Sequence, residues 1–273
     1  MAIITISREL AALGDETAHE LAKSLGYRFV DKQVLENRIK SFGISGDKFT
    51  KYDERKPSFF ASLSQDRDNY LHYLKSAILA EAEQGNSVFI GRGAYAVLAG
   101  VPALISVFLA ASMDIRIERV KSYFHCDEKR ARQIIERSDE DRRGFHRYFF
   151  DLDWKEPGNY SLSLNTGIFP PAVCAQLVCQ LKNQTISSET EIRHISRLKD
   201  LILGQRIKHH IIYDKEISIH FLDAMVFSNS VTLHGVAQSQ ALVEAAVNAA
   251  REISGDADVR SEIQIVHEYG IIA

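Results

Sequence analysis

The stretch that decides the fold is IITISRELAALGDETAHELAKSLG, residues 3–26. It opens on a β-branched apolar run, residues 3–6, which suits a strand buried on both faces of a parallel sheet. After a short polar turn, apolar residues recur at helical spacing, and Gly26 stands where a left-handed residue ends such a helix. A strand, a turn and a helix in this order indicate a nucleotide-binding βα unit. The start of such a helix offers free backbone N–H groups and the positive end of its dipole to a phosphate.

The turn itself departs from the phosphate-loop pattern G-x-x-x-x-G-K-[ST]. That pattern uses glycines for close backbone approach to a phosphate and a lysine for the β- and γ-phosphates. Here the turn holds one glycine, Gly14, between Leu13 and Asp15, and the lysine position falls on Gly14 or Asp15, depending on the alignment. Thr17 lies two residues later than the usual Ser/Thr ligand of the metal. On these residues alone, an ordinary start of a βαβ unit is the better interpretation.

Length and composition limit the class of protein. A chain of 273 residues is long for one compact domain and suits two. Apolar content of 45% and charged content of 25% are typical of a globular protein, and a net charge of −3 gives no electrostatic argument for nucleic acid. The sequence shows no signal peptide and no membrane-spanning run, and the three cysteines lack metal-ligand spacing. We therefore expect a cytoplasmic protein with free thiols.

Further buried strands are predicted at residues 87–90, 104–109 and 162–164, with helices between them, and this alternation indicates a parallel sheet. Arg92 follows the strand at 87–90 within Gly91-Arg92-Gly93. Ligands bind at the carboxyl edge of such a sheet, where a guanidinium group can hold a phosphate through two hydrogen bonds. A helix over 127–137 leads into a charged run, residues 139–143. For that run a solvated helix face is an equally good interpretation.

Five short segments resemble sequence motifs of the cytidylate kinase-like family, which is part of the P-loop nucleoside monophosphate kinase superfamily. They are Ser7-Arg8-Glu9; Leu25-Gly26-Tyr27 with Phe29-Val30-Asp31-Lys32; Gly91-Arg92-Gly93-Ala94; Asp139-x-x-Arg142 followed by Tyr148; and Asn159-Tyr160. The chain departs from the family mainly in the turn, where Ala11, Ala12 and Leu13 replace glycine and serine and Asp15 replaces a frequent arginine. Ile90 and Gly93 replace the acidic residues of classical cytidylate kinases, so the nucleobase stays open.

The resemblance implies a P-loop kinase fold with a five-stranded parallel sheet for residues 1–183. It also implies ATP and Mg²⁺ as cofactors, and phosphate transfer from ATP to a nucleoside monophosphate. The implied donor-binding residues are Ser7, Leu13, Gly14, Asp15, Glu16 and Thr17. The implied acceptor-binding residues are Asp31, Arg55, Arg92 and Asp139. Arg8, Arg142 and Arg143 are the implied catalytic residues, since this reaction is stabilised mainly by positioned charge. No side chain is predicted as a metal ligand.

A polar stretch without periodicity, residues 183–190, predicts a boundary and a second domain over 190–273. The predicted elements there are a helix at 192–201, strands at 216–221 and 230–234, a helix from Ser239, and a strand at 259–266. This αββαβ order, with Val-Thr-Leu-His-Gly-Val at 231–236, resembles a BON domain, a small α+β module. The resemblance implies contact with a protein or a membrane surface, and a homo-oligomer is possible. The scattered histidines do not predict a metal site.

Two functions remain open at this point. The first is an active kinase of the resembling family. The rival is a pseudo-kinase, weak or inactive, that acts as a nucleotide sensor or scaffold through the BON-like domain. The phosphate loop discriminates between them, because without its lysine and most of its glycines other groups must restore the stabilisation of the transition state.

Overall fold

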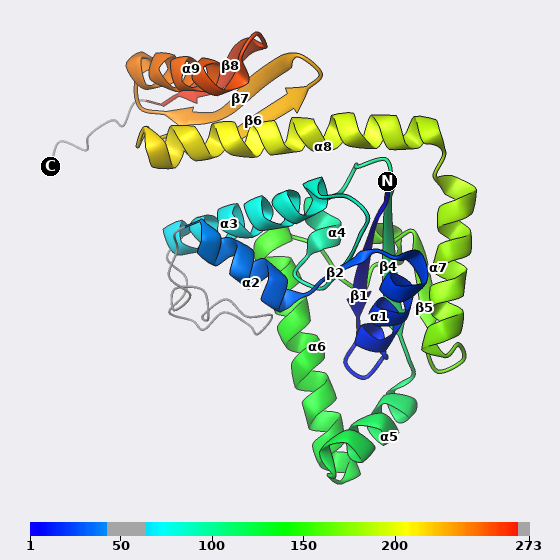
Figure 1. Cartoon of the computed structure of the whole chain (residues 1–273). Helices are drawn as coiled ribbons and strands as arrows, with labels where there is room; N and C mark the ends of the chain where they lie inside the picture. The colour runs from blue at the N-terminus through cyan, green and yellow to red at the C-terminus, as the bar shows by residue number, and fades with distance from the viewer. Residues whose placement is uncertain (43–63, 267–273) are drawn as a thin grey trace, which may run out of the picture. The chain divides into compact units, whose positions relative to one another are not determined.

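The structure is a computed structural model that describes residues 1–42 and 64–266, with side chains from residue 67 onward in the second range. The chain divides into two compact units, Met1–Ile192 and Arg193–Ala273 (Figure 1). In the described part of the chain, no helix has both the length and the apolar character needed to cross a membrane.

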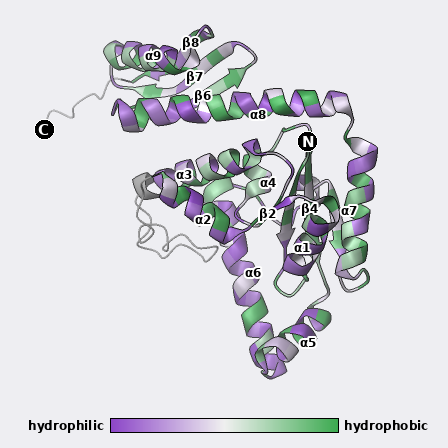
Figure 2. Ribbon diagram, in the orientation of Figure 1, coloured by the Kyte–Doolittle hydropathy of each residue, from purple (hydrophilic) through white to green (hydrophobic). Residues whose placement is uncertain are grey.

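The first unit is built on a five-stranded sheet in which every neighbouring pair of strands is parallel. The strands are β1 (Ile3–Arg8), β2 (Arg28–Val30), β3 (Ser87–Ile90), β4 (Leu104–Ala110) and β5 (Leu162–Asn165), in the order β2-β3-β1-β4-β5. Ile4 of β1 pairs with Val88 of β3 and Ile105 of β4, so the apolar run of β1 lies at the centre of the sheet. Figure 2 shows these central strands in the hydrophobic colour. The predicted five-stranded parallel sheet is confirmed.

Helices cover this sheet and form the outer parts of the unit. They are α1 (Gly14–Leu25), α2 (Lys32–Ser41), α3 (Ser64–Glu83), α4 (Ala94–Val97), α5 (Met113–Phe124), α6 (Glu128–Phe150) and α7 (Pro171–Thr185), with a 3₁₀ turn at Pro157–Asn159. Buried residues of α1 and α7 share one hydrophobic cluster with the strands, so these two helices pack on the same face. Gly26 ends α1 in a left-handed conformation (φ 65°). The helix predicted over 127–137 continues to Phe150, because buried residues such as Phe145 and Phe149 extend its apolar face.

The C-terminal half of α6 is anchored in an aromatic cluster. Phe150 packs against Gly93, where an added Cβ would lie 2.2 Å from its ring. His146, 4% exposed, stacks on Trp154 and lies 3.3 Å from the hydroxyl of Tyr95. Burial raises the pKa of Tyr95 above that of a free tyrosine, so the phenol stays neutral. This end of α6 is therefore part of the core.

A buried carboxylate joins α3 to β2 and α2. Glu81, 3% exposed, pairs with Arg28 through one oxygen and with Arg38 Nε through the other at 2.7 Å. Both arginines are about one-third exposed, so solvent reaches the cations but not the carboxylate. The ion pairs fix the edge strand β2 to the helices beside it.

The second unit contains a three-stranded sheet in the order β6-β7-β8, in which β6 and β7 are antiparallel and β7 and β8 parallel. Its elements are α8 (Ser188–His209, whose first residues belong to the first unit), a π-helical turn (His210–Asp214), β6 (His220–Phe227), β7 (Ser230–Ala237), α9 (Gln240–Ser254) and β8 (Asp258–Ile265). The helix predicted from Ser239 is α9, and the Ser239 side chain caps it. The αββαβ order is confirmed.

The strand predicted at 216–221 was wrong in position, since β6 begins only at His220. The π-helical turn and two left-handed residues, Glu216 (φ 52°) and Phe221 (φ 53°), interrupt the extended backbone before the regular part of the strand. The segment predicted as the boundary is mostly helical, because α7 runs to Thr185 and α8 begins at Ser188. The domain boundary at 183–190 stays a prediction.

Candidate functional site

The loop at the carboxyl end of β1, residues 9–13, leads into α1 with two left-handed residues. Ala11 has φ 61° and Leu13 has φ 51° and ψ 38°, a region that glycine adopts freely and other residues rarely do. Both residues stand at positions where this chain has alanine or leucine in place of the glycine and serine of the resembling family. Thr17 continues the turn by donating its hydroxyl to the carbonyl of Leu13 at 2.7 Å. The loop thus keeps a tightly wound backbone with side chains in place of glycines.

Arg8 lies across the first residue of α1. An added Cβ on Gly14 would be 2.4 Å from Cγ of Arg8, so this glycine is required by the close approach of that side chain. The Arg8 guanidinium, 17% exposed, lies 3.9 Å from the carboxylate of Asp15, which is 65% exposed. Glu16 is also exposed, in the same first turn. A cation, a glycine and two carboxylates therefore meet where the helix dipole is positive.

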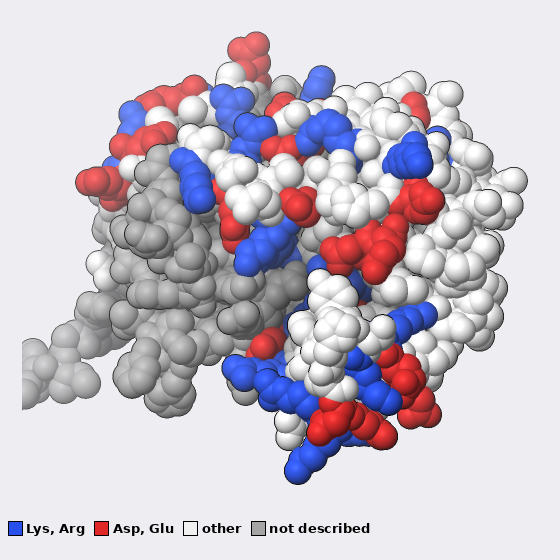
Figure 3. Space-filling view, turned by 60° about the horizontal axis from the view of Figure 1, so that its bottom comes forward, with Lys and Arg blue, Asp and Glu red and all other residues white. Residues whose placement is uncertain are grey.

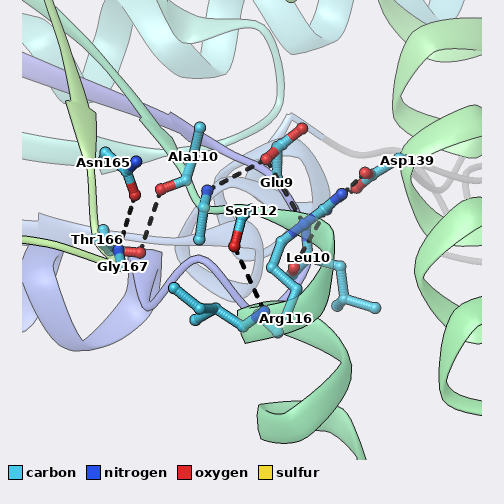
Figure 4. Close-up of polar contacts among 12 residues, drawn as sticks. Glu9, Leu10, Ala110, Ser112, Arg116, Asp139, Asn165, Thr166 and Gly167 are labelled. Carbon is cyan, nitrogen blue, oxygen red and sulfur yellow. Dashed lines mark hydrogen bonds and ion pairs between the residues drawn. The ribbon is translucent and has the colours of Figure 1, made fainter. Parts of the chain in front are cut away.

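Behind the loop, four charged side chains form a largely buried cluster, and Figure 4 labels three of them, Glu9, Arg116 and Asp139. Arg116 of α5 donates to Asp139 of α6 at 2.6 Å and its Nε lies 3.6 Å from Glu9. Lys155 pairs with Glu9 and lies 3.8 Å from Asp139. Asp139 also accepts the backbone N–H of Leu10 at 3.1 Å, and Glu9 accepts that of Ala111 at 3.3 Å. The two carboxylates are thus neutralised by cations and tied to the loop.

Arg119, one helical turn after Arg116, joins the loop to the end of β5. Its guanidinium donates to the carbonyl of Ala11 at 2.9 Å, and to the hydroxyl and carbonyl of Thr166 at 3.1 and 2.7 Å. Thr166 in turn donates to the carbonyl of Ala110, a contact that Figure 4 shows. Burial lowers the pKa of Arg119, although the side chain remains a cation at neutral pH.

The predicted catalytic arginines of α6 lie in different surroundings. Arg142, 13% exposed, donates to the hydroxyl of Ser138 at 2.7 Å and lies 3.8 Å from Asp139, so it belongs to the rim of the buried cluster. Arg143 is half exposed and pairs with Glu140 one turn earlier on the same helix. Their catalytic roles stay predictions, and the structure brings Arg142, but not Arg143, into contact with the cluster behind the loop.

Two of the four predicted acceptor residues, Asp31 and Arg92, lie just after the ends of β2 and β3. Asp31 caps α2 by accepting the N–H of Val34 at 2.9 Å. Arg92 is left-handed (φ 56°) and only 4% exposed, and it contacts the hydroxyl of Tyr70 at 3.2 Å and Glu36 of α2 at 3.4 Å. Arg55 lies outside the described residues. Asp139 is not at this edge, since it belongs to the cluster behind the loop.

Ser7, the last predicted donor-site residue, is buried at the end of β1. It makes a side-chain hydrogen bond with Tyr160, whose pKa is raised, chiefly by burial, so that this phenol also stays neutral. The Tyr160 hydroxyl donates to the carbonyl of Trp154 at 2.6 Å. Ser7 therefore helps to connect β1 to the aromatic cluster.

The residues at the start of α1 do not fit the usual hydroxyl ligand of Mg²⁺. Thr17 is fully buried, and its hydroxyl is hydrogen-bonded to Leu13 within the turn. Glu9 and Asp139 are held by cations, and among the described residues no group of three or more His, Cys, Asp or Glu side chains could hold a metal. The side chains around this turn therefore do not fit a Mg²⁺ site.

The charges around the loop nearly cancel. Five are positive (Arg8, Arg116, Arg119, Arg142 and Lys155) and four negative (Glu9, Asp15, Glu16 and Asp139), a difference of +1. Figure 3 likewise shows cationic and anionic side chains interspersed on the face that it presents. The charges around the loop therefore give no large positive field, so any attraction of an anion there depends on individual guanidinium and N–H groups.

Sequence reasoning missed the structural roles of Glu9, Arg116, Arg119, Lys155 and Thr166. A signal for the arginines was present, because residues 116 and 119 lie three apart and face the same side of a helix. Lys155 had no local signal, since its partner Glu9 is 146 residues away.

A parallel sheet in the order β2-β3-β1-β4-β5, with a tightly wound loop and a helix after its central strand, defines the class of kinase-like α/β proteins with a P-loop kinase fold. The chain belongs to the cytidylate kinase-like family, whose model matches residues 3–168. A BON domain model matches residues 199–267.

The chain is also similar to several solved structures. An uncharacterized protein from Eubacterium ventriosum ATCC 27560 is 20% identical with a TM-score of 0.55, over 67% of this chain and 99% of that one. Shikimate kinase from Bacteroides thetaiotaomicron is 16% identical (TM-score 0.41, 67% and 98% covered). The YorR protein of Bacillus subtilis, in complex with phosphorylated GDP, is 13% identical (TM-score 0.39, 67% and 96% covered). No curated protein matches the chain.

Proposed function

We propose that the first unit binds a nucleotide at the loop of residues 9–13 and the start of α1. The observation that carries the proposal is the tightly wound loop at the carboxyl end of β1, with Arg8 lying across Gly14 at the first residue of the helix. The unpaired N–H groups of that helix end and the Arg8 guanidinium are the donors that a phosphate needs. ATP is the proposed donor nucleotide, and a nucleoside monophosphate near Arg92 and Asp31 the acceptor.

The proposed transfer of phosphate is slow. The loop has no lysine, Leu13 places a side chain where close approach of a phosphate needs glycine, and Asp15 adds a negative charge. Arg116 and Arg119 are bonded to loop carbonyls and buried partners, so their charges already have counterparts. Because phosphoryl transfer depends on positioned cations, these features favour binding over turnover.

The second candidate function is the pseudo-kinase, a nucleotide sensor or scaffold that signals through the BON domain. The negative charge of Asp15 favours this function, because a carboxylate at the start of α1 repels the triphosphate of ATP. Under this function a nucleotide binds and no transfer follows. The nucleobase is open in both cases.

Calorimetric titration of the full chain with ATP and ADP, with and without Mg²⁺, tests the binding. A coupled assay over CMP, UMP, AMP and GMP tests the transfer. Binding with turnover near the usual ~1–100 s⁻¹ of kinases would refute the slow-transfer proposal. Binding without turnover favours the sensor, and no binding of any nucleotide refutes both functions. Asp15→Arg is the follow-up variant, since recovered binding would locate a defect in this turn.

A further inference from the structure

The left-handed conformation of Ala11 needs an explanation. An L-residue at φ 61° is disfavoured by its Cβ, and it persists when the surrounding structure determines its backbone. Within the loop itself, the N–H of Ala12 bonds to the carbonyl of Glu9 at 3.2 Å, which closes the turn. Side chains of α5 and α6 make further hydrogen bonds to the backbone of Leu10 and Ala11.

Two guanidinium groups of α5 hold the peptide planes on either side of Ala11. Arg116 Nη1 donates to the carbonyl of Leu10 at 3.4 Å, and Arg119 Nη1 donates to the carbonyl of Ala11 at 2.9 Å. The first carbonyl lies in the plane before the Ala11 Cα and the second in the plane after it. Because peptide groups are rigid, holding both planes fixes φ and ψ of Ala11.

Each arginine is itself held in place by the rest of the fold. Arg116 bonds to Asp139, whose other oxygen accepts the N–H of Leu10 at 3.1 Å. Arg119 makes two hydrogen bonds to Thr166 at the end of β5. Leu10 and Ala11 also pack against the apolar cluster between α5 and α6. Of the two contacts, the Arg119 bond is the shorter and lies directly on Ala11.

We propose that Arg119 is a positioning residue that keeps Ala11 left-handed and so sets the shape of the phosphate loop before a ligand binds. The inference rests on the nucleotide binding proposed above and adds to it the means by which a loop without glycine holds its shape. Glycine at position 11 would adopt this conformation without help. The contribution of Arg119 should therefore depend on which residue occupies position 11.

The experiment compares Arg119→Gln in two backgrounds of the full chain, the natural Ala11 and Ala11→Gly. ADP affinity is measured by calorimetry. We expect Arg119→Gln to weaken ADP binding about 10-fold with alanine at position 11, a change of about 1.4 kcal/mol. With glycine there, we expect Arg119→Gln to weaken ADP binding by less than about 3-fold relative to Ala11→Gly alone. Equal losses in both backgrounds, or none in either, would overturn the proposal, since a direct contact with ADP or a general effect on folding does not depend on position 11.

Hydrogen exchange of the free protein provides a readout that needs no nucleotide. Arg119→Gln should speed exchange of the amides of residues 9–14 and leave those of β7 in the second unit unchanged. If the natural protein binds no ADP, the proposed function fails, while exchange still decides the role of Arg119: unchanged protection of the loop refutes it. If Arg119→Gln does not fold, Arg119→Lys, which keeps the charge but cannot reproduce the planar set of donors, is tested in the same way.

Discussion

Replacing Asp15 by asparagine should move stability and ATP affinity in opposite directions. Asp15 lies in the first turn of α1, 65% exposed and 3.9 Å from the Arg8 guanidinium. The substitution keeps the size of the side chain and removes one negative charge from the end of the helix that is proposed to receive a phosphate. Two favourable interactions of the free protein are lost, and one repulsion in the complex is removed.

The loss of stability is small. An ion pair as exposed as that between Arg8 and Asp15 contributes about 0.2–1 kcal/mol. The interaction of a first-turn carboxylate with the helix dipole contributes about 0.3–1 kcal/mol. Together the two terms give a decrease of about 0.5–2 kcal/mol in the free energy of unfolding.

The gain in affinity is larger. A unit charge about 5 Å from a phosphate charge repels it by about 0.8 kcal/mol in water and about 3 kcal/mol at an effective dielectric constant of about 20. Removing that repulsion should tighten ATP binding by about 4- to 150-fold at low ionic strength. Added salt should reduce the gain, because the carboxylate is exposed.

Calorimetric titration with ATP and a thermal melt measure the two effects on the same samples. Glu20→Gln is the matched control, since it removes the same charge from the same helix five residues, or about 7.5 Å, further along. It should change ATP affinity by less than about 2-fold. An Asp15→Asn variant with unchanged or weaker affinity at low salt would refute the reasoning, because the carboxylate would then be remote from the phosphates or would assist their binding.

Three further changes test other parts of the structure. Glu81→Ala should lower the free energy of unfolding by about 1–3 kcal/mol in a urea titration, less than for a fully buried pair, because both arginine partners are partly exposed; a change below about 0.5 kcal/mol would contradict this. Hydrogen bonds to Asp214 and Glu252 raise the pKa of His210. The stabilisation of the second unit by charged His210 should be complete below pH 6.5 and lost as the pH rises through the higher pKa of the folded protein. In His210→Gln, the melting temperature should not show this decrease as the pH rises. Arg92→Ala should weaken binding of a nucleoside monophosphate and also lower the melting temperature, since its guanidinium is buried; unchanged binding in a destabilised variant would make this arginine purely structural.

Local patterns predicted most of the fold of the first unit. The β-branched runs of β1 and β3 gave buried strands because a central parallel strand is apolar on both faces. At the starts of α2, α5 and α6, Asp31, Ser112 and Asp127 cap the helices, since a short polar side chain can accept an N–H of the first turn. These features depend on residues close together in the sequence.

The candidate site was only partly predictable, because its contacts join distant segments. The expected arginine at 142 does reach the cluster behind the loop, but the lysine in that cluster comes from residue 155, whose sequence neighbourhood has no pattern. Arg119 looked like one of two arginines on a helix, and only the fold shows that it reaches Ala11 and Thr166. The left-handed conformation of Ala11 and Leu13 could not be predicted either, since nothing in the sequence Ala-Ala-Leu requires it.

The packing of Phe150 against Gly93 limits how the unit can change shape around a ligand. α6 is fixed at its C-terminal end by the ring on Gly93 and by the stack of His146 on Trp154. Rotation of the whole of α6 would break the packing of Phe150 and His146 in the core. Movement of α5 and the first turns of α6 must instead bend the helix between its two ends, so the amplitude is greatest near Cys126 and falls to almost nothing at Phe150. A spectroscopic label at the first position would report such bending, and a label at the second would not.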